Sequence, residues 1–126
     1  MLNHITIMGR LTREPELRRT NTGKAVTKFT LAVDRNGRDS GTDFIDCVAW
    51  EKTAELVDGY FARGQLAVAE GRLQLRDWTD KNGGKRRSAE VVVSGIYFAD
   101  MRRDEAKAAP KEDFAVLEGE DEGLPF

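Results

Sequence analysis

The amino-acid sequence predicts an all-β domain with one short helix, followed by an acidic tail. Three observations indicate this organisation: five segments alternate apolar and polar residues, one segment has helical periodicity, and the chain becomes small, charged and poor in apolar residues beyond Arg102. The chain has 126 residues, 40% of them hydrophobic, which suits one packed domain with an appendage. We therefore expect a folded domain over residues 1–102, a disordered linker over residues 103–117 and an acidic tip over residues 118–126.

Five segments have the period-two pattern of β-strands. In residues 4–11, the apolar Ile5, Ile7 and Leu11 fall on one side of the strand. In residues 28–33, the odd-numbered positions are apolar. The other three strand candidates are residues 44–50, 66–78 and 87–93. Glycine-containing and polar turn sequences separate strand candidates at residues 21–23, 36–41 and 80–84.

Residues 53–64 have helical periodicity instead. Ala54, Val57 and Phe61 lie on one helical stripe, Thr53 suits the N-cap, and Gly64 suits the left-handed position after the helix. One helix between the third and fourth of five strands is the element order of a five-stranded Greek-key barrel, the OB-fold. This fold binds oligonucleotides, sugars or partner proteins, so the fold alone leaves the function open.

The fourth strand candidate has a pattern typical of single-stranded nucleic-acid binding. Its even-numbered positions are Arg72, Gln74, Arg76 and Trp78. We expect the alternating Leu73 and Leu75 to face the core, which turns the indole and the guanidinium groups outward. A base can stack on an outward indole while the cations follow the phosphates. In the alternative interpretation, Trp78 covers the barrel end and the arginines are solvated surface charges.

Two more large aromatic residues share one face of the third strand candidate. Phe44 and Trp50 lie on the same side as Asp46, and because an unpaired carboxylate is rarely buried, this face is at least partly exposed. We interpret it as a stacking platform, although a subunit interface would have the same pattern. Cys47, on the opposite face, is interpreted as a small core residue.

Basic residues recur in the predicted loops and at strand ends, where they can follow a nucleic-acid backbone. They are Arg10, Arg13, Arg18, Arg19, Lys24, Lys28, Arg35, Arg38, Lys81, Lys85, Arg86 and Arg87.

Catalysis and metal binding have little support in the sequence. His4 is the only histidine, Cys47 is the only cysteine, and there is no metal-ligand spacing or phosphate-binding glycine loop. Asp43, Asp46 and Glu90 are the one acidic set that a metal-dependent nuclease could use. We expect no enzyme activity, no cofactor, no metal, no disulfide, no membrane segment and no secretory signal, and hence a cytoplasmic protein.

The charge is unevenly distributed along the chain. Residues 104–126 contain eight acidic residues and two lysines, a net charge of −6, which leaves +4 for residues 1–103 of a chain whose total is −2. The chain ends on an apolar tripeptide in which Pro125 restricts the backbone. Such a tip suits capture by a partner protein. The candidate partner-binding residues are Asp121, Glu122, Leu124, Pro125 and Phe126. A frayed, solvated tail is the alternative.

Several segments, in order, resemble the bacterial single-stranded DNA-binding protein family. They include residues 3–11 (NHITIMGRL), 14–18 (EPELR), 29–33 (FTLAV), 43–50 (DFIDCVAW) and 64–73, then Trp78, residues 90–93 and the acidic tip. The resemblance spans residues 3–98. It implies a non-catalytic, nucleoid-associated protein that coats single-stranded DNA in replication, recombination and repair. It also implies a homotetramer that recruits replication and repair proteins through the C-terminal tip.

Carried over position by position, the resemblance implies stacking roles for Phe44, Trp50 and Trp78. The implied phosphate contacts are Arg10, Arg35, Arg72, Arg76, Lys85 and Arg86. The chain departs from the family at residues 35–38 (RNGR), where an aromatic residue is usual, and at Gly123, where an acidic residue is commoner. The remaining alternatives are a replication-restart protein resembling primosomal replication protein N, a metal-dependent nuclease and a protein-interaction barrel.

Overall fold

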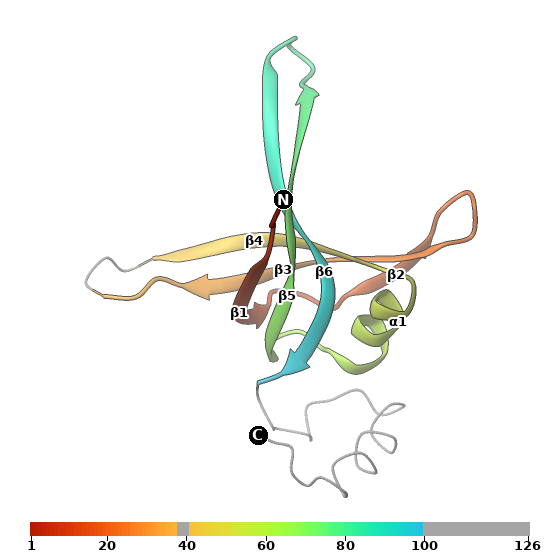
Figure 1. The fold of residues 1–126 in the computed structure, drawn as a ribbon, viewed down its shortest axis with the longest axis vertical. Coiled ribbons are helices and arrows are strands. Elements are labelled where there is room, and N and C mark those ends of the chain that lie inside the picture. Colours follow the sequence, from red (N-terminus) through yellow and green to blue (C-terminus); the bar gives the residue numbers. More distant parts are fainter. Residues whose placement is uncertain (38–40, 100–126) are drawn as a thin grey trace, which may run out of the picture.

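The structure is a computed structural model that describes residues 1–37 and 41–99. These residues form six strands and one helix (Figure 1). The strands are β1 (Ile5–Leu11), β2 (Glu16–Arg19), β3 (Ala25–Asp34), β4 (Thr42–Trp50), β5 (Leu66–Thr79) and β6 (Lys85–Phe98), and the helix is α1 (Glu51–Tyr60). The prediction of a mostly β domain with one short helix is therefore confirmed.

The strands form one sheet that closes on itself. Its order is β1-β5-β6-β4-β3-β2, and β1 also pairs with β3. The β4–β6 pairing, between residues 47–49 and 91–93, is parallel, whereas the other pairings are antiparallel. This closure gives the predicted OB-type barrel. In Figure 1, the β5–β6, β3–β4 and β2–β3 hairpins extend outward from the barrel in three directions.

One face of each strand builds the core. In β3, every second residue from Ala25 to Leu31 is buried, which is the alternation expected of a strand with one covered face. Thr27 is the polar member of this row, and its hydroxyl donates a 3.1 Å hydrogen bond to the Ala54 carbonyl oxygen of α1. The bond satisfies a buried polar group and fixes the helix to the barrel.

Helix α1 begins and ends earlier than the predicted residues 53–64. Ala54 and Val57 are buried, as their shared stripe predicts, but the N-cap position belongs to Trp50 instead of Thr53. Trp50 makes no side-chain cap hydrogen bond, and the first helical residue, Glu51, has a φ of 53°. The direct passage from β4 into α1 therefore overrides the capping preference of Thr53.

The helix ends at Tyr60 because the backbone becomes extended at Phe61. The Phe61 ring then stacks on Phe98 of β6 with a centroid separation of 4.3 Å, which closes this end of the core. Gly64 does adopt the left-handed conformation, with a φ of 87°, but it lies in the turn before β5. There its N–H donates a 2.8 Å hydrogen bond to the Leu11 carbonyl oxygen.

The structure contains one strand more than the five predicted. The additional strand, β2, has four residues and pairs with the first part of β3. Its sequence, ELRR, has three charged residues and shows no apolar alternation. Its one apolar residue, Leu17, packs partly buried against the core. A single apolar residue shows no alternation, so a pattern search cannot find this strand.

The prediction that Leu73 and Leu75 face the core is wrong. Their side chains are 40% and 54% exposed, although they share a face of β5 with the buried Ala67 and Ala69. Beyond Gly71 the β5–β6 hairpin leaves the barrel, so the same face of the strand is no longer covered (Figure 1). Alternation identifies the face of a strand but does not show where the neighbouring layer ends.

Strand β6 extends beyond the predicted residues 87–93 and changes its buried face on the way. Ser94 is an extra residue between two registers of the β5–β6 pairing. Val91 and Val93 are buried before this bulge and Ile96 is buried after it. A bulge shifts the inward positions by one residue, so the period-two pattern in the sequence stops at Val93.

The predicted linker over residues 103–117 and the tip over residues 118–126 lie outside the described residues, and so does Arg38. Within the described part of the chain, no helix is long and apolar enough to cross a membrane.

Candidate nucleic-acid interface

Phe44 and Trp50 lie on the outward face of β4, with exposed fractions of 66% and 41%. Asp46, between them, is exposed as predicted, and its carboxylate accepts a 3.1 Å hydrogen bond from the Thr30 hydroxyl on β3. The two rings are six positions apart along the strand, a distance of about 20 Å. They are therefore two contact points on one surface and do not touch.

This surface continues across the neighbouring strands. Val48, between the two aromatic residues, pairs with Lys28 on β3 and with Val92 on β6, and Val92 pairs with Arg72 on β5. Paired residues point to the same side of a sheet. Lys28 and Arg72 therefore lie on the outward face on either side of β4.

Arg35 pairs with Asp43 at the base of the β3–β4 hairpin. Its Nη2 lies 2.8 Å from the Asp43 carboxylate, and its Nε donates to the same group. This hydrogen bonding raises the pKa of Arg35 and lowers the pKa of Asp43. Because Asp43 directly precedes Phe44, the pair orders the backbone beside the exposed ring. Both partners are about half exposed, and an exposed pair of this kind contributes little, so a phosphate can replace the carboxylate.

Trp78 lies on the free part of the β5–β6 hairpin, where it is 44% exposed. Its indole Nε1 donates a 2.7 Å hydrogen bond to the Ser88 hydroxyl on β6. In the β5–β6 pairing, Trp78 lies directly opposite Arg86. A cavity of about 430 Å³ adjoins it. The lining residues are Asp77, Trp78, Thr79, Lys85, Arg86 and Arg87. An oriented aromatic ring and three cations therefore surround one opening.

Asp80 holds the turn at the end of this hairpin. Its carboxylate accepts hydrogen bonds from the backbone N–H groups of Gly84 (2.8 Å) and Asn82 (3.0 Å) and from the Arg86 Nε (2.9 Å). These bonds, led by the one from Gly84, lower the pKa of Asp80. The turn thereby fixes the position of Arg86 next to Trp78.

The other predicted phosphate contacts lie on the outer surface as well. Arg10 on β1 donates a 3.0 Å hydrogen bond to the Gly64 carbonyl oxygen, and Arg72 donates a 2.9 Å hydrogen bond to the Gln74 side chain. Arg76 and Lys85 are both exposed on the β5–β6 hairpin.

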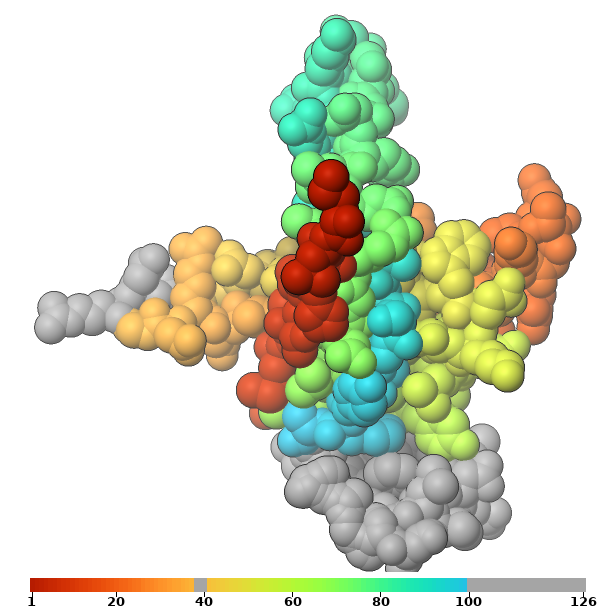
Figure 2. All heavy atoms as spheres, in the orientation of Figure 1, coloured from red at the N-terminus to blue at the C-terminus, as the bar shows by residue number. Residues whose placement is uncertain are grey.

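The structure thus groups the predicted site residues in part. One group is on the β5–β6 hairpin: Arg76, Trp78, Lys85 and Arg86. A second lies at the β3–β4 hairpin, with Arg35 and Phe44, while Trp50 stands at the far end of β4. Figure 2 shows that the β5–β6 hairpin is a separate arm and that the β3–β4 hairpin extends in another direction. Arg10 on β1 pairs with Ala32 on β3, and Ala32 pairs with Phe44, so Arg10 lies in the same row of the sheet as Phe44. The five predicted partner-binding residues, 121–122 and 124–126, are outside the described range.

The described residues contain no arrangement that supports metal or thiol chemistry. No group of three potential metal ligands occurs within residues 1–37 and 41–99. Cys47 is buried in the core, as predicted, and this burial, with the nearby charges of Asp46 and Glu90, raises its pKa to about 12. The thiolate that reacts with electrophiles or metals is therefore scarce at neutral pH.

The sequence assignment of the site omits a cluster of charges beside Trp50. The sequence places Arg13, Arg18 and Lys28 among the basic residues that can follow a nucleic-acid backbone but does not group them, whereas the structure brings them together over β2 and β3. The signal that would reveal the cluster is the β2–β3 pairing, and β2 carries no apolar pattern by which to predict it.

Comparisons with known proteins agree with this geometry. The model of the single-strand binding protein family matches residues 2–99. A single-stranded DNA-binding protein of Halalkalibacterium halodurans is 39% identical over 90% of this chain and 70% of its own length. Single-stranded DNA-binding protein 1 of Streptococcus pyogenes is 35% identical over the whole of both chains.

The fold comparison gives the same result. A solved structure of the Plasmodium falciparum SSB in complex with single-stranded DNA superimposes with a TM-score of 0.73 at 29% identity, covering 79% of this chain and 96% of the other. With a family match over residues 2–99 and an outward face of exposed aromatic and basic side chains, the chain belongs to the single-strand binding protein family.

Proposed function

We propose that this protein binds single-stranded DNA without regard to base sequence, and that it coats and protects the strand in replication, recombination and repair. The observation that carries the proposal is the exposure of Phe44 and Trp50 on the outside of the barrel and of Trp78 on the β5–β6 hairpin, each with basic side chains nearby. Every base has a π-face, so stacking on such rings tolerates any sequence.

The proposed roles follow from the positions of the side chains. Phe44, Trp50 and Trp78 stack bases. The phosphates are neutralised by Arg10, Arg35, Arg72, Arg76, Lys85 and Arg86. Because the described barrel presents flat rings and flexible cations, it neutralises the backbone and stacks the bases without reading base edges. We infer that the protein acts by binding and needs neither a cofactor nor a metal.

We further infer that four chains assemble into a homotetramer. One OB domain offers few stacking sites, and linking several domains on one strand raises the effective concentration of each. The exposed Leu73 and Leu75 support assembly, since a face that continues the barrel core is apolar and uncovered in the single chain. Sedimentation should give a particle of four chains, and a monomer that binds DNA equally tightly would contradict the inference.

The acidic C-terminal tip is proposed to recruit replication and repair proteins. Its composition supports this role, because residues 118–126 combine acidic side chains with a final Leu-Pro-Phe. Charged groups can steer the tip to a basic partner, which then buries the terminal ring.

The test of the DNA-binding function is a titration of the full chain, followed by tryptophan fluorescence and by gel shift. Single strands of several base compositions should bind with similar affinity, duplex much more weakly, and the affinity for single strands should fall steeply with salt. Magnesium should have no specific effect. Equal affinity for duplex and single strand would exclude the proposed function, and cleavage of the strand in magnesium would indicate a nuclease.

A further inference from the structure

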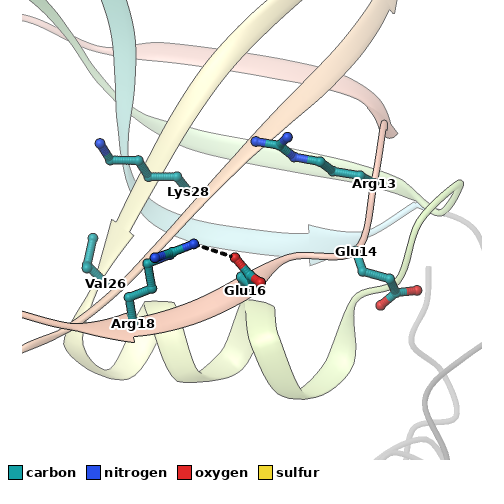
Figure 3. Close-up of a pocket in the computed structure, with 6 residues that line it drawn as sticks. All are labelled: Arg13, Glu14, Glu16, Arg18, Val26 and Lys28. Atoms are coloured by element: carbon teal, nitrogen blue, oxygen red, sulfur yellow. Dashed lines mark hydrogen bonds and ion pairs between the residues drawn. The ribbon is translucent and has the colours of Figure 1, made fainter.

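A groove with a volume of about 590 Å³ runs over β2 and β3, and none of its lining residues is among the stacking and phosphate residues proposed above. The lining residues are Arg13, Glu14, Glu16, Arg18, Val26 and Lys28. Figure 3 shows the six side chains, with Arg18 and Glu16 directed toward each other and Glu14 extending away from them. The groove therefore has three cations, one carboxylate within it and one directed elsewhere.

The groove is continuous with the ring of Trp50. Arg18 on β2 pairs with Val26 on β3, and Val26 pairs with Trp50 on β4. All three side chains point to the same side of the sheet, and two strand spacings separate Arg18 from Trp50 at the backbone, about 10 Å. Lys28 lies one row further along the same face, opposite Glu16. When a base of single-stranded DNA stacks on Trp50, the neighbouring phosphates are therefore within reach of these cations.

Glu16 forms an ion pair with Arg18, the arginine that such a phosphate would bind. The Glu16 carboxylate lies 2.9 Å from the Arg18 Nη2, and the two side chains are 74% and 75% exposed. Exposed pairs of this kind contribute little to the stability of a protein, so the contact is readily exchanged. Glu14 does not compete in the same way, because its carboxylate accepts the backbone N–H of Arg63 at 3.3 Å.

We propose that this groove is a further subsite for the single strand, in which Arg18, Lys28 and Arg13 take the phosphates next to the nucleotide stacked on Trp50. Glu16 is the resident counter-charge of the subsite, and the DNA backbone displaces it from Arg18. This inference rests on the proposed DNA-binding function and extends its path from β4 across β3 to β2.

The chain contains a matched control on the opposite face of the same strand. Arg19, which the sequence places among the basic residues able to follow a backbone, follows Arg18 in β2 and points to the opposite face. There it pairs with Glu55 of α1, with 3.9 Å between Nη2 and the carboxylate, so the structure places it off the proposed path of the DNA. Arg18→Gln and Arg19→Gln therefore remove the same charge from adjacent positions, and Glu16→Gln and Glu55→Gln remove the two partner charges. The change in net charge is the same for both variants of a matched pair. Only the variants at Arg18 and Glu16 alter a proposed contact with the DNA.

The experiment measures the affinity of the full-length variants for oligothymidylate at several salt concentrations. Arg18→Gln should weaken binding at low salt and reduce the slope of log affinity against log salt by about 0.7, the value for one phosphate contact on a single strand. Glu16→Gln should tighten binding, and this gain should vanish in the Arg18→Gln background. Arg19→Gln and Glu55→Gln should show only the general electrostatic effect of one lost charge, which is smaller than the effects of Arg18→Gln and Glu16→Gln.

Equal effects of Arg18→Gln and Arg19→Gln, or a gain from Glu16→Gln that persists without Arg18, would overturn the subsite and leave DNA binding intact. Failure of the parent protein to bind the oligonucleotide would instead overturn the proposed function. The two failures are therefore distinguishable in one data set.

Discussion

The Trp78 indole donates a 2.7 Å hydrogen bond from Nε1 to the Ser88 hydroxyl, across the two strands of the β5–β6 arm. The bond orients a ring that is otherwise 44% exposed and has no core around it. A ring whose orientation is set in advance loses less conformational entropy when a base stacks on it. The contribution of the Trp78 ring to DNA binding and the contribution of its fixed orientation can therefore be tested separately.

Trp78→Ala should weaken binding of single-stranded DNA by about 1–3 kcal/mol, the range for one base–aromatic stack. Ser88→Ala should weaken it less, because the ring remains but its orientation is lost. Ser94→Ala is the matched control, since Ser94 is on the same strand but bonds the Glu70 carbonyl oxygen outside the arm. Fluorescence titration measures all three, and full affinity in Trp78→Ala would remove this residue from the site.

The Asp80 turn should respond to acid. Hydrogen bonds from Gly84, Arg86 and Asn82 hold the pKa of Asp80 below its ordinary value of 3.8. The ionised carboxylate therefore stabilises the turn above that ordinary value, and the contribution is lost as the pH falls through the lower, folded-state pKa. Asp80→Asn keeps an acceptor for the N–H groups but removes the charge that pairs with Arg86.

The measurement is the thermal midpoint of the parent and Asp80→Asn proteins as a function of pH. The parent should be more stable at neutral pH, and the difference should shrink only below about pH 4. A difference that stays constant into strong acid would show that the charge of Asp80 does not support the turn.

Cys47 should not react with alkylating reagents in the folded protein at pH 8. Burial raises its pKa to about 12, so both access and thiolate are lacking. In denaturant the same thiol should react at the rate of an ordinary cysteine. Mass spectrometry after timed exposure to iodoacetamide measures both rates, and rapid labelling without denaturant would contradict the buried position.

Gly71→Ala should destabilise the domain by about 1–3 kcal/mol, the usual cost of forcing an extra carbon into a packed site. A Cβ at Gly71 would collide with the Val92 carbonyl oxygen, where β5 and β6 pair at the bulge. Gly59→Ala is the control. In the described structure nothing outside α1 and the neighbouring residues lies within 4 Å of its added carbon, so it should stabilise the helix by up to about 1 kcal/mol. Denaturant unfolding distinguishes the two outcomes.

Removal of residues 123–126, or Phe126→Ala, should abolish recruitment of partner enzymes and leave DNA affinity unchanged. Removal of residues 104–126 should in addition tighten DNA binding at low salt, because a segment of net charge −6 no longer competes for the basic face. High salt should erase this gain. Titrations at two salt concentrations and pull-downs with each form provide the measurements. Weaker DNA binding on truncation, or the same partners with every form, would favour a frayed tail.

The sequence by itself determined the strands that line the core and the exposure of the candidate stacking residues. Period-two alternation is imposed by the backbone of a strand, so Phe29 and Leu31 could be placed inside and Phe44 and Trp50 outside without a structure. Asp46 settled the direction, because an unpaired carboxylate is excluded from the core for electrostatic reasons. The resemblance to the family rested on the same local segments.

Only the tertiary structure decided where each strand leaves its neighbours and which distant residues meet. Leu73 and Leu75 follow the pattern of core residues, yet the barrel ends before them, and Ser94 reverses the inward positions of β6 through a bulge. Strand β2 exists because β3 offers it free hydrogen-bonding groups, and that pairing brings Arg18 beside Trp50. The physical reason is that side-chain alternation is a local property, whereas coverage, register and charge clustering depend on chain segments far apart in the sequence.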